Sequence, residues 1–225
     1  MTRQLAFDLP VGEAYRRADF FISPANAEAL SCVEAWRDWP AGKMLLIGPI
    51  GAGKTHLAHL WAETAGAKII AARNLLGYDL PMLARSPVAV EDADLIAQNR
   101  EAETALFHLH NLMAAQGQGL LVTAASPPRD WGLCLPDLKS RLQAASLVSL
   151  APPDDALLSA VLVKLFADRQ ITVPPNLISF LILRMDRSIA AARDLVAILD
   201  ARALAMGRPV TRTLAAEVLD SYAEA

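Results

Sequence analysis

The sequence predicts an α/β core, in which helices flank a parallel sheet, followed by a small all-helical lid domain. From residue 43 onward, short apolar runs alternate with amphipathic stretches, as strands and their covering helices do. After Pro152 and Pro153 only helical patterns follow. We therefore expect a flexible tail over residues 1–12, the α/β core over 13–151 and the helical lid over 152–225.

Five strands and three helices are expected in the core. The longest helix rests on Ala102, Leu106, Leu109 and Met113, which recur at helical spacing. A shorter helix is expected to begin at Pro136, because proline is well tolerated in a first helical turn. The predicted strands are 44–47, 68–71, 88–91, 120–124 and 147–150, and the predicted helices are 56–63, 101–116 and 136–143.

Four helices are expected in the lid domain. Asp154, Ser188 and Thr211 precede three of them and are suitable N-cap residues. Gly207 is a suitable C-terminal stop, since glycine readily adopts the left-handed conformation found there. The predicted ranges are 154–169, 175–185, 188–206 and 211–223.

Composition narrows the functional classes. The 225 residues are 54% hydrophobic and 20% charged, which is typical of a globular protein and not of a disordered one. The longest apolar runs, such as 177–183, fall short of the roughly 18 residues that a membrane span needs. The net charge of −3 comes without a block of basic residues, so no general nucleic-acid footprint is evident. Cys32 and Cys134 have no metal-ligand spacing, and reduced thiols in the cytoplasm are the simplest interpretation.

A glycine-rich segment matches the phosphate-binding motif G-x-x-x-x-G-K-[ST] in full, between an apolar strand and a helix. Its glycines allow successive N–H groups to face phosphate oxygens. Lys54 is expected to neutralise the β- and γ-phosphates, and the Thr55 hydroxyl to ligate Mg²⁺. The alternative is an ordinary glycine-rich turn, which the strand–loop–helix context disfavours. The predicted nucleotide-binding residues here are Gly48, Pro49, Ile50, Gly51, Ala52, Gly53, Lys54, Thr55 and His56.

Acidic residues follow the strand predicted over 88–91. In nucleotide hydrolases of this type, a second strand ends in acids that hold Mg²⁺ and polarise the attacking water. Glu91 is assigned the magnesium position and Asp92 the water-activating position. The alternative is a strand end with solvated acids of no chemical role. Glutamate at the magnesium position suggests slow hydrolysis, because Mg²⁺ demands near-ideal geometry.

Several segments together resemble the AAA+ module of the DnaA-related family, and most closely its Hda-like regulatory inactivators of DnaA. The phosphate loop is generic, whereas the LPDLKSRL segment is more discriminating. Residues 20–27 (FFISPANA) are similar to the segment on the adenine side of the family's nucleotide site. The other segments that carry the resemblance are 48–57 (GPIGAGKTHL), 120–128 (LLVTAASPP), 135–142 (LPDLKSRL) and 185–187 (MDR).

The resemblance implies an AAA+ fold, bound ADP or ATP with Mg²⁺, and two functional arginines. Arg141 matches the arginine finger, which acts in trans on the γ-phosphate of a neighbouring molecule. Its alternative role is a surface arginine that caps a short helix. Arg187 matches the sensor arginine of the lid, and Arg193 is a weaker competitor for that role. Generic packing or a salt bridge would also explain either lid arginine.

The first residues resemble the short clamp-binding peptides of the Hda-like proteins. Gln4 is followed by apolar anchors at alternate positions, Leu5, Phe7 and Leu9, which suits an extended peptide in a groove. The resemblance therefore implies the DNA polymerase sliding clamp as a partner. The alternative is a first strand, or a tail that docks on its own domain.

Two departures from the family pattern bear on activity. The position expected to hold a polar sensor after residues 120–124 is Ala125, and with Glu91 this suggests weak or absent intrinsic ATPase activity. The resemblance ends after the lid, without a helix-turn-helix domain, so sequence-specific DNA binding is not expected.

The resulting hypothesis is a cytoplasmic, nucleotide-bound regulator of replication initiation. It would dock on the sliding clamp and stimulate hydrolysis of DnaA-bound ATP through Arg141, with a homo-oligomer as a further possibility. An autonomous ATPase of the helicase-loader or remodelling type is the main alternative, and a nucleotide-dependent scaffold is another.

Overall fold

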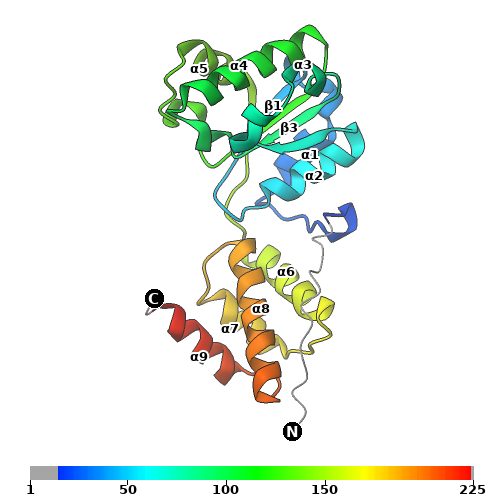
Figure 1. Cartoon of the computed structure of the whole chain (residues 1–225). Helices are drawn as coiled ribbons and strands as arrows, with labels where there is room; N and C mark the ends of the chain where they lie inside the picture. Colours follow the sequence, from blue (N-terminus) through cyan, green and yellow to red (C-terminus); the bar gives the residue numbers. More distant parts are fainter. Residues whose placement is uncertain (1–14, 224–225) are drawn as a thin grey trace.

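The computed structural model describes residues 15–223, which form an α/β core and a separate helical bundle (Figure 1). All strands of the core belong to one parallel five-stranded sheet, with the order β2-β3-β4-β1-β5. Its strands are β1 (Lys43–Ile47), β2 (Lys68–Ala71), β3 (Val88–Glu91), β4 (Leu120–Ala124) and β5 (Ser146–Ser149). The predicted fold class is confirmed, and each predicted strand lies within one residue of its observed bounds.

Helices cover both faces of this sheet, because successive strand residues point to opposite sides. In β1, Leu45 and Ile47 pack in one cluster with residues of α4 and α5. Met44 and Leu46 pack in a second cluster with residues of α1 and α2. The core helices are α1 (Ala27–Glu34), α2 (Lys54–Ala65), α3 (Leu80–Leu83), α4 (Arg100–Ala115) and α5 (Pro136–Gln143).

Short 3₁₀ segments connect several of these elements, and sequence patterns did not indicate them. Each is only three to six residues long, too short to show a helical period. They are η1 (Arg17–Asp19), η2 (Trp36–Asp38), η3 (Pro40–Gly42), η4 (Ala72–Gly77), η5 (Ala93–Ile96) and η6 (Pro128–Asp130).

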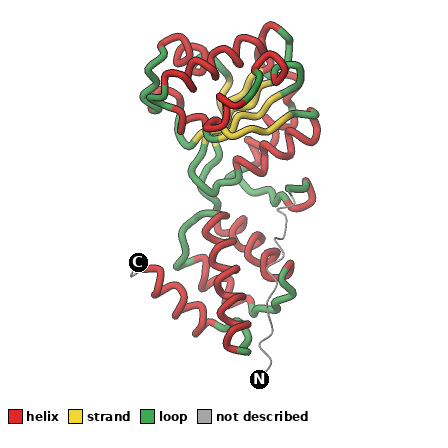
Figure 2. The backbone as a smooth tube through the Cα atoms, in the orientation of Figure 1, coloured by secondary structure: helices red, strands yellow, loops and turns green. Residues whose placement is uncertain are grey.

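The bundle contains the four predicted helices (Figure 2). Their apolar side chains form a core separate from those of the sheet. The predicted N-caps are confirmed: Asp154, Ser188 and Thr211 accept backbone N–H bonds from Leu157, Ala191 and Leu214 at 2.8, 3.3 and 3.3 Å. Gly207 ends its helix in the left-handed conformation, with φ 61°. The helices are α6 (Asp155–Asp168), α7 (Pro175–Ile182), α8 (Ile189–Met206) and α9 (Arg212–Ala223).

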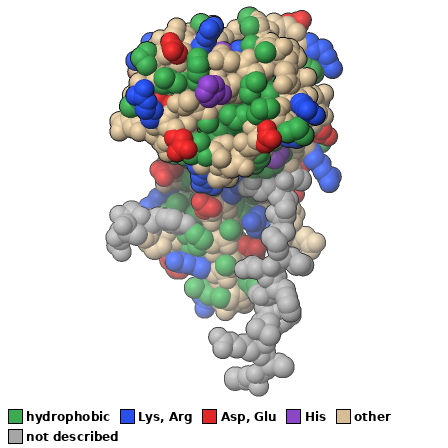
Figure 3. All heavy atoms as spheres, turned by 45° about the horizontal axis from the view of Figure 1, so that its top comes forward, with side chains coloured by type: hydrophobic (Ala, Val, Ile, Leu, Met, Phe, Trp, Pro, Cys, Tyr) green, Lys and Arg blue, Asp and Glu red, His purple; other side chains and the backbone are tan. Residues whose placement is uncertain are grey.

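The surface of the core carries both signs of charge. On the face in Figure 3, lysine, arginine and acidic side chains are interspersed among apolar ones, without a continuous basic stripe. None of the helices within residues 15–223 has the length and apolar character needed to cross a bilayer. Cys32 and Cys134 are free thiols.

The titratable side chains of Lys43 and His110 are buried next to each other near the start of β1. Lys43 and His110, on α4, are 7% and 5% exposed, and Lys43 Nζ lies 3.3 Å from His110 Nδ1. Burial, and then the Arg141 guanidinium, lower the pKa of Lys43. Burial, and then Lys43, lower the pKa of His110 to about 4, although a contact with Asn111 opposes this. His110 is therefore neutral in the folded protein at pH 7.

This histidine makes the folding stability depend on pH. The unfolded chain protonates His110 as pH falls through 6.5, whereas the folded chain does so only near 4. The stabilisation is complete above pH 6.5 and is lost as pH falls towards 4, by at most about 3 kcal/mol. We expect His110→Gln to remove this part of the acid sensitivity in urea unfolding at pH 4.5 and 7. The control His108→Gln replaces an exposed histidine on the same helix and should leave the acid sensitivity unchanged.

Candidate nucleotide-binding site

The glycine-rich loop lies between β1 and α2, at the carboxyl edge of the sheet. Gly51 and Gly53 have φ angles of 74° and 108°, which glycine adopts without steric cost. Gly53 is the N-cap of α2, so the first free amides of that helix face the loop. A glycine-rich loop that leads into a helix N-terminus is a suitable anion site, because amides and the helix dipole both favour negative charge.

Lys54 lies inside this loop. It is 8% exposed, and its ammonium donates to the carbonyl oxygens of Gly48 at 2.7 Å and Pro49 at 3.1 Å. Burial lowers the pKa of Lys54, while the charges of Asp92 and Asp94 oppose that effect. A phosphate group would compensate the buried charge better than the two carbonyls do, since charge-assisted bonds are the stronger ones.

A cavity of about 380 Å³ opens beside the loop, within the range that small-molecule sites occupy. The core and the lid helix α8 both contribute to its walls. Of the predicted nucleotide-binding residues, Gly48, Pro49, Ala52 and Arg187 are outside the lining. The lining residues are Tyr15, Ile50, Gly51, Gly53, Lys54, Thr55, His56, Asp92, Asp94, Leu95, Ala125, Ile189, Ala190 and Arg193.

Acidic side chains from the segment after β3 enter the lining. Asp92 has a positive φ of 54°, and its N–H donates to Thr123 Oγ1 at 3.1 Å. Asp94 Oδ2 accepts the N–H of Ala125 at 3.1 Å. Sequence reasoning gave Asp92 a role but overlooked Asp94, which is two residues further along a 3₁₀ turn that had not been predicted. Ala125 contributes its backbone amide here, and no polar side chain.

Glu91 is at the carboxyl end of β3, outside the lining. Its Oε1 is buried and has no hydrogen-bond partner among the described residues. A buried acceptor in this state is costly, so a hydrated cation beside it would be stabilising. Oxygen donors from Thr55, Asp92 and Glu91 are the ligand type that Mg²⁺ prefers, so these residues fit that ion. The magnesium role of Glu91 stays a prediction.

The lid arginine in the lining is Arg193, and the sequence prediction had favoured Arg187. Arg187 is outside the lining, where its guanidinium bonds to Asp155 at 2.6 Å and to the Pro153 carbonyl at 3.3 Å. Arg193 is one turn beyond Ile189 on α8, and Ile189 donates its N–H to the Gly51 carbonyl at 2.8 Å. Residues four apart share a helix face, so Arg193 lies on the same side of α8 as Ile189, which contacts the loop.

The two lid arginines make a matched pair for a binding measurement. We expect Arg193→Ala to weaken ADP affinity by about tenfold, because a hydrogen bond to a charged group contributes about 1.5–3 kcal/mol. Arg187→Ala should leave ADP affinity within about twofold, since Asp155 already pairs with that guanidinium. Calorimetric titration would compare them, and the reverse order of effects would support the predicted sensor role of Arg187.

The lining residues Tyr15 and His56 pack against each other and against further aromatic rings. Tyr15 stacks on His59 with ring centres 4.2 Å apart, and its edge meets His56 at 5.4 Å. Phe20, the first residue of the expected adenine-side segment, is 9% exposed and packs edge-on against His56 at 5.1 Å. Burial is the main cause that lowers the pKa of His56. Sequence reasoning missed Tyr15, because a lone tyrosine before a short 3₁₀ turn carries no periodic signal.

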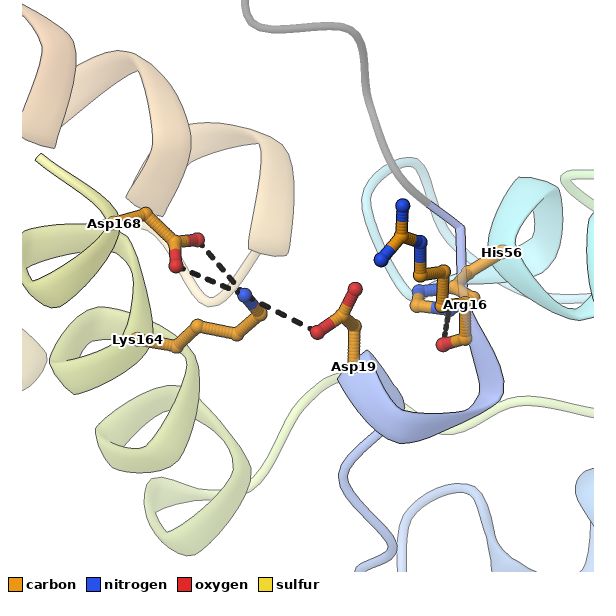
Figure 4. A network of polar contacts seen from close by, with 5 residues as sticks. All are labelled: Arg16, Asp19, His56, Lys164 and Asp168. Atoms are coloured by element: carbon orange, nitrogen blue, oxygen red, sulfur yellow. Dashed lines mark hydrogen bonds and ion pairs between the residues drawn. The ribbon is translucent and has the colours of Figure 1, made fainter.

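The segment that contains Arg16 and Asp19 connects the core to the lid (Figure 4). His56 Nε2 contacts the Arg16 carbonyl at 3.2 Å, and Asp19 forms an ion pair with Lys164 of α6 at 3.2 Å. Lys164 also pairs with Asp168 at 2.9 Å. These contacts raise the pKa of Lys164, with the hydrogen bond to Asp168 as the largest cause. The cavity thus has walls from two domains that are joined on this side.

Arg141 and the tail are not part of this cavity. Arg141 is exposed on α5 and is outside the lining, and among residues 15–223 no carboxylate forms an ion pair with it. The predicted clamp-binding residues Gln4, Leu5, Phe7 and Leu9 lie outside the described residues.

The replication initiator DnaA is among the known proteins that resemble this chain, in sequence and in structure. No protein-family model matches the chain. The DnaA of Thermomicrobium roseum is 25% identical over 232 residues, which cover 91% of this chain and 49% of that protein. The chain therefore spans about half the length of this curated relative.

Solved structures give the same result at the level of fold. Domain III of Thermotoga maritima DnaA superposes with a TM-score of 0.80 at 19% identity, covering 94% of this chain and 98% of that one. A DnaA bound to AMPPCP and single-stranded DNA superposes with a TM-score of 0.70 at 16% identity, covering 82% and 64%. The chain thus has the AAA+ fold of DnaA domain III, with a sequence similar to DnaA over most of its length.

Proposed function

We propose that this protein is a nucleotide-bound AAA+ regulator of replication initiation. It docks on the DNA polymerase sliding clamp and stimulates hydrolysis of the ATP bound to DnaA through Arg141. The observation that carries the proposal is that the candidate nucleotide cavity and Arg141 lie at different places on the molecule. A phosphate loop, acids and a lid arginine surround one cavity, while Arg141 is exposed on α5 outside it.

The cavity binds ADP or ATP in this account. Lys54 and the amides of the loop hold the phosphates, and Arg193 approaches them from the lid. The hydroxyl of Thr55, with Asp92 and Glu91, would hold Mg²⁺, which neutralises phosphate charge. The AMPPCP complex of the DnaA structure with the same fold supports an adenine nucleotide as the ligand.

Arg141 acts on a partner in this account. A guanidinium that stabilises charge developing on a γ-phosphate must reach it, which an exposed side chain outside its own cavity can do only in a neighbouring molecule. Arg141 lies close enough to Lys43 and His110 to help lower the pKa of both. The basic side chains of Arg141 and Lys43 together suit the approach of a polyphosphate.

The direct test is a hydrolysis assay with ATP-loaded DnaA and with clamp loaded on DNA. Adding this protein should increase hydrolysis of DnaA-bound ATP by a large factor, and omitting the clamp should abolish most of the increase. The contrary outcome is a DnaA hydrolysis rate that the protein leaves unchanged at every concentration, with clamp present.

The clamp contact is assigned to Gln4, Leu5, Phe7 and Leu9. Their alternation suits an extended peptide, with the leucines and Phe7 as anchors and Gln4 at the rim of a groove. A chain that lacks residues 1–10 should keep its nucleotide affinity and lose clamp binding in a pull-down with purified clamp. If that shortened chain binds the clamp as well as the full chain does, this assignment is wrong.

An autonomous ATPase, of the helicase-loader or remodelling type, is the second candidate. The presence of Asp92 and Asp94 in the cavity with Lys54 favours it, because these acids could polarise a water. Turnover of ATP by the purified protein alone would support this candidate. Either function would operate in the cytoplasm, and a homo-oligomer would be compatible with both.

A further inference from the structure

Glu103 is a carboxylate in the first turn of α4 with no exposed surface at all. Its relative exposure is 0%, and among residues 15–223 no cation forms an ion pair with it. A carboxylate this deep is expensive unless hydrogen bonds compensate it. The nucleotide site does not use Glu103, and sequence reasoning assigned it no role.

Three backbone amides compensate this carboxylate. Oε1 accepts the N–H groups of Gln98 at 2.8 Å and Cys134 at 3.1 Å, and Oε2 accepts that of Leu135 at 2.7 Å. Bonds of this kind to an ionised acceptor are about twice as strong as neutral ones. Both oxygens are thereby used to hold backbone segments, and not to anchor another side chain.

These three amides belong to two segments that lie far apart in the sequence. Gln98 ends the loop that begins with Asp92 and Asp94 at the nucleotide cavity, and it has a positive φ of 68°. Cys134 and Leu135 lead directly into α5, the helix that carries Arg141. One buried carboxylate therefore joins the acidic loop of the cavity to the helix of the proposed arginine finger.

Glu103 also caps the N-terminus of α5, because the N-cap residue of that helix cannot do so with its own side chain. Leu135 is the N-cap residue of α5 and has no side chain that can accept a hydrogen bond. The first amides of a helix need acceptors, and a negative charge there also complements the helix dipole. A carboxylate from α4 meets this need at Leu135, and so fixes where α5 begins relative to α4.

We infer that Glu103 is a positioning residue for Arg141: it fixes α5 relative to the acidic loop and so sets where the guanidinium is presented. The inference rests on the proposed arginine-finger function. A guanidinium must be placed within a fraction of an ångström to stabilise a transition state, and a misplacement of 1 Å costs about 100-fold in rate.

Glu103→Gln is the central variant, because it keeps the shape and replaces one acceptor oxygen by an amide donor. We expect stimulation of DnaA-bound ATP hydrolysis to fall by about 10- to 100-fold in maximal rate. The concentration for half-maximal stimulation and the affinity for ADP should stay within about twofold, because neither depends on Arg141. In the Arg141→Ala background, Glu103→Gln should have no further effect, since a residue that acts through Arg141 has nothing left to position.

Two variants separate this role from a general effect on folding. Asp79→Asn changes another carboxylate that accepts a helix amide, Met82 N–H of α3 at 3.1 Å, and should leave stimulation intact. Glu103→Asp keeps both oxygens and should restore part of the activity that Glu103→Gln loses. The inference is overturned if Glu103→Gln and Glu103→Asp both lose ADP binding, or if Glu103→Gln and Arg141→Ala have additive effects.

Amide hydrogen exchange tests the inference without DnaA. In the ADP complex, Glu103→Gln should speed exchange at Cys134 and Leu135 by at least about tenfold, because their acceptor is lost. The amide of Leu157, which Asp154 caps in the lid, serves as the internal reference and should not change. If wild-type protein fails to stimulate DnaA while this exchange result holds, the proposed function is wrong and the positioning of α5 stands. Unchanged exchange at both amides would overturn the inference.

Discussion

Arg141→Ala is expected to lower the stimulated rate of DnaA-bound ATP hydrolysis by about 1,000-fold. The guanidinium is the one group in this account that contacts the partner's γ-phosphate, where charge develops in the transition state. Arg141→Lys should recover little, because an ammonium lacks the planar fork that binds two phosphate oxygens. The measurement is single-turnover hydrolysis by ATP-loaded DnaA, with clamp on DNA present.

The control for this variant is Arg208→Ala, which removes an exposed arginine from the helical domain. It should leave stimulation unchanged, and both variants should bind ADP as the wild type does, since neither residue lines the cavity. Full stimulation by Arg141→Ala would remove the arginine-finger role and leave a scaffold function.

Gly51→Ala is expected to weaken nucleotide affinity by about 100-fold, which corresponds to about 2.7 kcal/mol. The φ of Gly51 is 74°, where a β-carbon costs about 1–2 kcal/mol. That carbon would also collide with the Ser188 side chain at the start of α8. The loop would have to move away from the lid, and its amides would then leave the phosphate positions. Fluorescence titration with a labelled ADP would measure the change.

Gly207→Ala is the matched control for backbone strain. Gly207 has a φ of 61°, but a β-carbon there would meet nothing within 4 Å. It should lower stability by about 1 kcal/mol and leave ADP affinity unchanged. Adding Ser188→Gly to Gly51→Ala should restore part of the affinity, because it removes the collision but not the strain. Equal ADP affinity in Gly51→Ala and wild type would contradict this picture of the loop.

Local patterns predicted most of the fold. Apolar runs marked β1, β3 and β4 most clearly, because strands buried on both faces read as continuous apolar segments. The edge strands β2 and β5 are partly exposed and carry shorter apolar runs. Asp154, Ser188 and Thr211 marked helix starts for a chemical reason that acts locally. The 3₁₀ turns and the four-residue α3 were missed, because segments this short do not repeat a helical period. The eight-residue α1 was also absent from the predicted helices.

The candidate site was predicted less completely than the fold. Lys54 and Thr55 follow from a motif in which spacing alone fixes the chemistry. Asp94 and Arg193 enter the cavity through the turn after β3 and the angle of α8, which depend on long-range packing. Glu103 gave no signal either, since a single glutamate on a helix resembles any solvated one until its burial is known.

Calorimetric titration of the purified protein with ADP and ATP, in the presence of Mg²⁺, tests the central claim most directly. The account predicts one adenine nucleotide bound per chain, and an affinity at least about tenfold weaker in Lys54→Ala, which removes the buried ammonium of the loop. A wild-type protein that binds neither nucleotide would contradict it.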